Sequence, residues 1–183
     1  QQFRLTIHHT NHDPVFASQP VLHAVEDSLY LYQSFATDVD SMLFGDRIRY
    51  SFTTRPAWLS IDSVSGIVSG TPRIENLADS IVVIVARDDS GSGVQQTFNI
   101  SIRHVNHTPV IISTPIMEAH EDSQYTYTLA VVDPDTLIGE LIGITFLRGP
   151  AWLSLDQENA ILKGSPGAIH VGIDTVIVEV RDD

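Results

Sequence analysis

Apolar and polar residues alternate over short stretches along most of the chain. In TFNISI (97–102), Phe98, Ile100 and Ile102 fall on one side of an extended backbone, and the polar residues between them fall on the other. This period of two is typical of a half-buried β-strand. Similar runs predict further strands: FRLTI (3–7), LYLYQSF (29–35), IRYSF (48–52), SIVVIVA (80–86), YTYTLAV (125–131) and DTVIVEV (174–180).

Turn-forming sequences separate these runs. DSVSG (62–66), DDSGSG (88–93) and KGSPG (163–167) are rich in the residues that favour tight turns. No segment combines an apolar stripe of helical period with helix caps. The pattern therefore predicts an all-β protein built as a Greek-key β-sandwich, with about seven short strands in each ~95 residues.

The chain repeats itself at an interval of 95 or 94 residues. Residues 10–40 recur as residues 105–135, and both stretches contain Asn-His, Glu-Asp-Ser and Asp-x-Asp in the same order. A period of this length corresponds to a whole small domain. We therefore predict two tandem seven-stranded sandwiches, at 11–105 and 106–183. The paired positions are Asn11 and Asn106, Glu26 and Glu121, Asp38 and Asp133, Trp58 and Trp152, and Asp88 and Asp182.

The two ends of the chain show the same repeat. QQFRLTIHHTNH (1–12) matches QQTFNISIRHVNH (95–107), which predicts that residues 1–10 are the last strand of a preceding repeat. The second repeat stops at VRDD (180–183) and so lacks its last strand within this chain. An unpaired sheet edge favours association. We predict that residues 1–8 fill repeat 2 of another copy, giving a homo-oligomer, either a head-to-tail filament or a closed ring. The alternatives are that residues 1–8 stay unpaired, or that the missing strand lies beyond residue 183.

Composition excludes several classes of function. The formal net charge is −13, which disfavours nucleic acid and anionic membranes as partners. The chain has no cysteine, so disulfides and thiolate metal sites are excluded. No apolar run reaches the ~20 residues of a membrane span. No phosphate loop, nucleophile elbow or supported catalytic triad is present, so we predict that the protein is not an enzyme.

The most specific motifs are two long segments of the first repeat. WLSIDSVSGIVSGTP (58–72), followed by SIVVIVARDDSGSGVQQTFNISIRHVNHTPV (80–110), resembles the cadherin-like repeats of the dystroglycan type and the related immunoglobulin-like repeats of microbial surface proteins. The resemblance covers residues 11–183. It implies a seven-stranded antiparallel sandwich, repeats strung end to end, calcium at the junctions, and an extracellular or cell-surface location.

The resemblance also implies which residues hold calcium, a cation that takes six to eight oxygen ligands. The Asp-x-Asp pair and the Asp of Val-Arg-Asp would face the junction before their own repeat, and the Glu of Glu-Asp-Ser would face the junction after it. The implied inter-repeat site consists of Glu26, Glu75, Asn106, Asp133, Asp135 and Asp182. The implied N-terminal site consists of Asn11, Asp38, Asp40 and Asp88.

Two features of the sequence bear on this calcium prediction. The family usually has an aspartate where this chain has His12 and His107, and a neutral imidazole is a poor ligand for a hard cation. The sites are therefore expected to bind calcium more weakly, or fewer ions. The alternative is that the same acidic residues only cap turns.

We predict an adhesion or spacer module stiffened by calcium, with a glycan or a surface protein as further partners. The rival hypothesis is a carbohydrate-binding module of a secreted polysaccharide-active protein. Trp58 and Trp152 distinguish the two, because we expect core positions whereas the rival needs aromatic rings exposed to sugar. The rival also needs exposed rings among Tyr30, Tyr32, Tyr125 and Tyr127.

Overall fold

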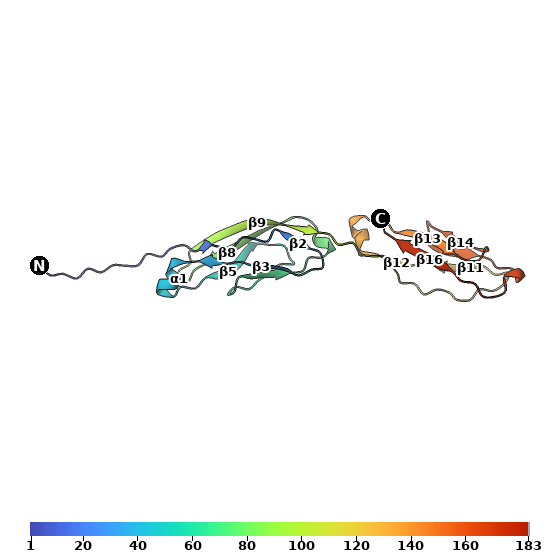
Figure 1. Cartoon of the computed structure of the whole chain (residues 1–183), viewed down its shortest axis with the longest axis horizontal. Coiled ribbons are helices and arrows are strands. Elements are labelled where there is room, and N and C mark those ends of the chain that lie inside the picture. The colour runs from blue at the N-terminus through green and yellow to red at the C-terminus, as the bar shows by residue number, and fades with distance from the viewer. Residues whose placement is uncertain (183) are drawn as a thin grey trace. The chain divides into compact units, whose positions relative to one another are not determined.

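The computed structural model describes residues 1–182, which form two compact units at 1–105 and from 106 onward (Figure 1). Nearly all regular structure in both units is β-strand, which confirms the predicted all-β class. Among the described residues, no helix has the length and apolar character needed to cross a membrane.

Unit 1 is a sandwich of two main sheets. The larger sheet has the order β2 (His23–Val25), β9 (Gly93–Arg103), β8 (Ser80–Arg87), β5 (Arg49–Thr54). The smaller sheet has the order β3 (Tyr30–Gln33), β7 (Ile67–Gly70), β6 (Ser60–Ile61). β1 (Val15–Phe16) pairs with β4 (Ala36–Thr37). β2 runs parallel to β9, and every other pair is antiparallel.

The core of unit 1 lies between these sheets and follows the alternation seen in the sequence. Phe98 and Ile100 of β9 are buried, as are Val82 and Ile84 of β8. They pack with Tyr30, Tyr32, Leu59 and Val68 from the side of the smaller sheet. Because side chains alternate across a strand, each polar residue between them points to the opposite face.

Unit 2 repeats this architecture with fewer strands. Its sheets are β11 (Tyr125–Thr128), β15 (Ile161–Gly164) and β14 (Leu153–Asp156); β13 (Gly143–Arg148) and β16 (Ile177–Arg181); and β10 (Val110–Ile111) and β12 (Val131–Val132). Its buried core is smaller and consists of Tyr127, Leu129, Leu153 and Leu162.

Both tryptophans pack against their cores, as predicted. The ring of Trp58 meets Tyr30 edge-on at a centroid distance of 5.8 Å, and Trp152 meets Tyr125 in the same way at 5.9 Å. Each indole contacts the core cluster of its own unit while remaining half-buried. The repeated Trp-Leu-Ser motif therefore encodes one packing arrangement in both units.

Gly70 and Gly164 are required by this arrangement. A Cβ added at either glycine would overlap the backbone carbonyl of Trp58 or Trp152. Gly70→Ala and Gly164→Ala are therefore each expected to destabilise their own unit, by about 1–3 kcal/mol. Thermal denaturation of the two variants measures this. Gly172→Ala is the control, since nothing lies within 4 Å of its added Cβ and its backbone is not in the left-handed region. Equal stability of Gly70→Ala and wild type would contradict the packing argument.

Short helices, which the sequence pattern did not predict, are also present. They are α1 (Val39–Phe44), η1 (Ile74–Asn76), η2 (Pro134–Ile138) and η3 (Ala168–His170). α1 and η2 follow the two Asp-x-Asp motifs, and Asp38 and Asp133 cap them by accepting a hydrogen bond from the backbone two residues on. A helix of one or two turns has no apolar stripe long enough to be detected.

Residues 3–7, predicted as a strand from their alternation, do not form one in this chain. Residues 1–14 contain no strand, and Phe3, Leu5 and Ile7 are 78%, 78% and 87% exposed. A strand needs a neighbour for its backbone groups, and no described segment pairs with this one.

Unit 2 has fewer strands than unit 1 among the described residues. No strand there occupies the position that β9 holds in unit 1, and β16 pairs only with β13. Residues 118–120, the counterpart of β2, also form no strand. β2 pairs with β9 in unit 1, so its counterpart in unit 2 lacks the corresponding partner.

Candidate metal-binding site

Four residues far apart in the sequence meet at one end of unit 1. Asn11 precedes β1, Asp38 and Asp40 begin α1, and Asp88 follows β8. The amide Nδ2 of Asn11 donates to Asp88 Oδ2 at 2.8 Å, and the backbone N–H of Asp40 donates to Asp38 Oδ1 at 2.7 Å. All four residues of the predicted N-terminal calcium site therefore lie within one network, which His12 completes.

Several oxygen atoms in this network are buried without a partner. Asp40 and Asp88 are 1% and 6% exposed. Asn11 Oδ1, Asp38 Oδ2 and Asp88 Oδ1 accept no hydrogen bond from any described residue. A buried polar oxygen without a partner is unfavourable, and buried charges are normally paired or coordinate a metal. An oxygen-only donor set with orphaned acceptors fits a hard cation such as calcium.

The negative charge of this end is concentrated further by Asp46 and Asp89. Burial raises the pKa of Asp46, and the nearby carboxylates of Asp88, Asp89, Asp38 and Asp40 raise it further. Like charges at short range disfavour ionisation of each other, whereas a bound cation would relieve that repulsion. Asp46 was not identified from the sequence, because it belongs to no repeated motif.

His12 binds one of the carboxylates. Its backbone N–H donates to Asp40 Oδ2 at 2.7 Å, and its Nδ1 lies 3.1 Å from Asp40 Oδ1. His9 Nε2 lies 3.4 Å from the same oxygen. Burial acts to raise the pKa of Asp40, but the hydrogen bonds from His12 and the two imidazoles hold it below its usual value. The histidine in the place of the family's aspartate thus contacts Asp40, and the orphaned oxygens belong to Asn11, Asp38 and Asp88.

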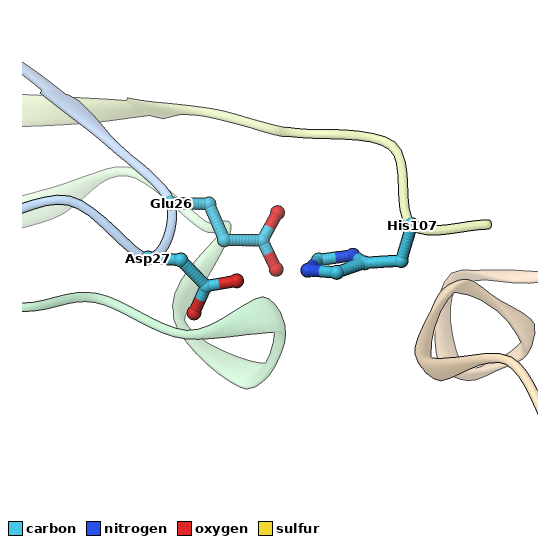
Figure 2. A group of neighbouring side chains, drawn as sticks. All are labelled: Glu26, Asp27 and His107. Carbon is cyan, nitrogen blue, oxygen red and sulfur yellow. The ribbon is translucent and has the colours of Figure 1, made fainter.

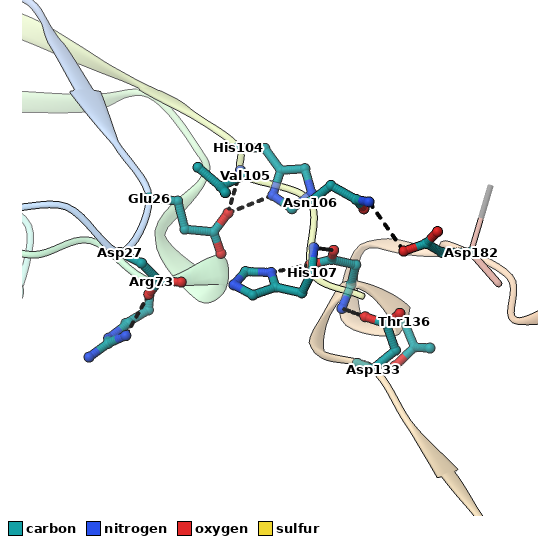
Figure 3. A network of polar contacts seen from close by, with 11 residues as sticks. Glu26, Asp27, Arg73, His104, Val105, Asn106, His107, Asp133, Thr136 and Asp182 are labelled. Atoms are coloured by element: carbon teal, nitrogen blue, oxygen red, sulfur yellow. Dashed lines mark hydrogen bonds and ion pairs between the residues drawn. The ribbon is translucent and has the colours of Figure 1, made fainter. Parts of the chain in front are cut away.

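Unit 2 repeats this network (Figure 3). Asn106 Nδ2 donates to Asp182 Oδ2 at 3.2 Å, the His107 backbone N–H donates to Asp135 Oδ2 at 2.5 Å, and the Asp135 N–H donates to Asp133 Oδ1 at 2.9 Å. Asp135 is fully buried, and Asp133 Oδ2 is buried without a hydrogen-bond partner among the described residues. Four of the six residues predicted for the inter-repeat site are therefore assembled within unit 2.

The remaining two predicted residues lie in unit 1. Glu26 follows β2 and is 1% exposed, and its Oε2 accepts hydrogen bonds from His104 Nδ1 at 2.5 Å and from the backbone of Val105 at 3.0 Å. Its other oxygen, Oε1, is buried without a hydrogen-bond partner among the described residues. Asp27 comes next in the same turn, as Figure 2 shows. Glu75 lies exposed in η1.

The tyrosines that would favour the carbohydrate-binding hypothesis do not form an exposed platform. Tyr30, Tyr32 and Tyr127 are 4%, 3% and 7% exposed, and Tyr125 is half-buried against Trp152. Tyr32 and Tyr127 also use their hydroxyls within their units, through hydrogen bonds to Ser18 and Ser113. These rings belong to the core.

Comparison with known proteins gives one family match and several structural likenesses. The family described as "Putative Ig domain" matches residues 13–103. Human protocadherin-24 EC1-2 is similar in fold, with a TM-score of 0.51, 15% identity and 93% coverage of both chains. No curated protein matches the chain.

Two further solved structures are similar over 93% of this chain. They are an endo-fucoidan hydrolase from glycoside hydrolase family 107 (TM-score 0.44, 24% identity) and a protocadherin gammaB7 EC3-6 cis-dimer (TM-score 0.48, 18% identity). The chain spans 27% and 48% of their lengths.

Proposed function

We propose that the chain is a calcium-binding module of an extracellular repeat array. The Putative Ig domain family model matches residues 13–103, and unit 2 repeats the sandwich of unit 1. The module is a spacer or an adhesion element and not an enzyme. The observation that carries the proposal is the set of buried oxygens without hydrogen-bond partners at Asn11, Asp38 and Asp88, together with Asp133 at the same position of unit 2.

The residues of this set suit calcium better than other ions. Their free atoms are carboxylate and amide oxygens, the ligands that calcium takes, whereas zinc prefers nitrogen and sulfur. Carboxylates crowded around Asp46 repel one another until a cation neutralises them. In a secreted protein this chemistry makes the ends of each repeat stable only when calcium is present.

The test is thermal unfolding of the chain with and without calcium. A ligand that binds only the folded state stabilises it by about 2.7 kcal/mol when its concentration is one hundred times Kd. Millimolar calcium is therefore expected to raise Tm, and EGTA is expected to reverse the rise. Magnesium at equal ionic strength is the control. Superimposable melting curves in calcium, magnesium and EGTA would reject the proposal.

Glu26 and Glu75 provide a second measurement, because the sequence assigns both to the inter-repeat site. Glu26→Gln is expected to weaken one class of calcium sites about tenfold, which corresponds to about 1.4 kcal/mol. The reason is that Glu26 Oε1 is buried without a hydrogen-bond partner among the described residues, so it is available to a cation. Glu75→Gln is the matched control, and we expect a smaller effect because this side chain is exposed. Calcium titration by calorimetry measures both, and equal affinities for wild type and Glu26→Gln would remove Glu26 from the site.

We further propose that copies of the module associate head to tail through strand addition. Support comes from the edge of β16, which has a partner on only one side among the described residues, and from the exposed apolar residues near the N-terminus. An open edge is a template for a strand from another chain.

A further inference from the structure

The smaller sheet of unit 1 has an apolar outer face as well as an apolar inner one. In β3, Tyr30 and Tyr32 point into the core, whereas Leu31 between them points outward. In β7, Val68 is buried and Ile67 points outward in the same way. We call the exposed apolar side chains of this face the outer apolar patch; they are 39% to 65% exposed and consist of Leu29, Leu31, Phe35, Val64 and Ile67.

The members of the outer apolar patch are neighbours in space. Gln33 of β3 lies opposite Ile67 of β7, so that Leu31, two residues before Gln33, is the diagonal neighbour of Ile67 on the same face. Phe35 and Val64 together line a depression of about 520 Å³. Single exposed apolar residues are ordinary, whereas a contiguous apolar surface marks a site of interaction.

Unit 2 builds the same sheet with a polar outer face. β11 and β15 pair in the register of β3 and β7, so that Thr126 opposite Lys163 takes the place of Leu31 opposite Ser69. Lys163 is the single lysine of the chain and forms an ion pair with Asp156 at 2.7 Å. Of the patch, only Ile67 recurs with the same residue type, as Ile161; the other positions of unit 2 hold Gln124, Thr126, Ala130 and Glu158.

The comparison of the two units shows which face of the sheet folding requires. The inner face is apolar in both, since Tyr125, Tyr127 and Leu162 repeat the inward side chains of β3 and β7. The outer face is polar in unit 2, and the sheet forms there all the same. The outer apolar patch of unit 1 is therefore not needed to form the sheet, which favours a role in binding.

The outer apolar patch is uncharged although the chain is strongly acidic. The strands β3, β7 and β6 contain no charged residue. At one end of the sheet, Asp27 and Arg73 neutralise each other at 2.5 Å. At the other end, Asp62 accepts hydrogen bonds from the backbone of its own turn. Two copies that each carry a net charge of −13 repel one another, and this repulsion is weakest between uncharged surfaces. A second copy therefore suits this face, whereas a cationic partner is attracted to the carboxylates elsewhere.

We propose that the outer apolar patch of unit 1 is a contact between two copies of the chain, packed sheet against sheet about a two-fold axis. The same surface is used on both copies, so apolar side chains meet apolar side chains and association stops at a dimer. Gln33, Ser60 and Ser69 supply uncharged polar groups beside the apolar centre. The contact is separate from calcium binding and from the head-to-tail association proposed above.

The first experiment gives unit 1 the outer face of unit 2. The test variant carries Leu29→Gln, Leu31→Thr and Val64→Glu, and sedimentation velocity measures dimerisation over a range of concentrations. All chains also carry Leu5→Asp, which removes an exposed apolar side chain of the N-terminal segment and so suppresses head-to-tail association. We expect the Leu5→Asp chain to form dimers that do not grow further. The test variant is expected to dimerise at least a hundredfold more weakly.

Ile81→Thr is the matched control for the first experiment. Ile81 is an exposed aliphatic residue of β8 in the larger sheet, and unit 2 has Thr175 at this position. We expect Ile81→Thr to dimerise within about threefold of the Leu5→Asp chain. A Leu5→Asp chain that stays monomeric at every concentration overturns the proposal, and so does a test variant that dimerises as well as its parent.

The second experiment locates the contact without altering the apolar residues. The chain has no cysteine, so a single introduced thiol is a specific probe. Ser69→Cys places it on β7, the central strand of the smaller sheet, and Lys163→Cys places it at the equivalent position of unit 2. The reagent is a bis-maleimide whose spacer spans the ~10 Å between packed sheets. We expect cross-linked dimers from Ser69→Cys at a yield at least tenfold above that from Lys163→Cys. Equal yields overturn the proposal.

The salt dependence of dimerisation identifies the chemistry of the contact. Salt screens the repulsion between two acidic chains and does not weaken an apolar contact. We therefore expect the dimerisation constant of the Leu5→Asp chain to stay constant or rise as sodium chloride is increased. A dimer that dissociates as salt is added is held by ion pairs, and that result overturns the proposal.

Discussion

Trp58→Ala is expected to lower the free energy of unfolding of unit 1 by about 3–5 kcal/mol, the usual range for removing a core aromatic side chain. The indole contacts Tyr30 edge-on and packs against the main core cluster. Trp58 also lies against Gly70, where an added Cβ would overlap its backbone carbonyl. Removing it leaves a cavity beside Leu59, which is 1% exposed. A loss of this size is a large fraction of the stability of a domain with about 95 residues.

Trp152→Ala provides the matched comparison in unit 2. Its contacts to Tyr125 and Gly164 repeat those of Trp58, but the core behind it is smaller. Denaturant unfolding followed by far-UV circular dichroism reports on both units, and the fluorescence of the remaining tryptophan identifies the transition of the unit that was not changed. If Trp58→Ala unfolds at the wild-type denaturant concentration but loses binding to a glycan, the carbohydrate-binding hypothesis replaces ours.

Asp88→Asn is expected to remove most of the calcium-dependent stabilisation at the N-terminal end of unit 1. The substitution keeps the size of the side chain and retains an oxygen to accept the hydrogen bond from Asn11 Nδ2. It removes the charge from the residue whose Oδ1 is buried without a partner and which raises the pKa of Asp46. In EGTA the variant is therefore expected to be at least as stable as wild type, and in saturating calcium it is expected to be less stable.

When the calcium concentration is one hundred times Kd, binding at one site stabilises the folded protein by about 2.7 kcal/mol. Asp79→Asn is the matched control, because it makes the same change of charge at an exposed residue outside this network. The measurement is the calcium-induced rise in Tm, obtained for wild type and both variants from melting curves in calcium and in EGTA. An equal calcium-induced rise in Asp88→Asn and wild type would show that the carboxylates of this network only cap turns.

Asp135→Ala is a less specific test. Asp135 is fully buried and accepts a hydrogen bond from the His107 backbone. Its removal leaves that donor without its acceptor, which destabilises the fold even without calcium. Asp88 is the better choice because its free oxygen has no structural hydrogen bond to lose.

The sequence by itself determined the fold class, the repeat and the positions of the acidic residues. Alternation at Phe98, Ile100 and Ile102 specifies a buried face, because successive side chains of a strand point to opposite sides whatever the strand pairs with. The interval of 95 or 94 residues places each acidic residue at the same point of two equivalent domains. Both signals are local or periodic, so they are readable without coordinates.

Only the tertiary structure decided which of these residues share a network and which of their atoms remain unpaired. Asn11 and Asp88 are 77 residues apart, and their hydrogen bond exists because strands from different parts of the chain end at the same place. The same holds for the pairing of His12 with Asp40 and for the crowding around Asp46. The alternation in residues 3–7 predicted a strand, yet no described segment pairs with these residues. Burial and pairing depend on contacts between distant segments, and a one-dimensional pattern specifies the face of a strand but not its partner.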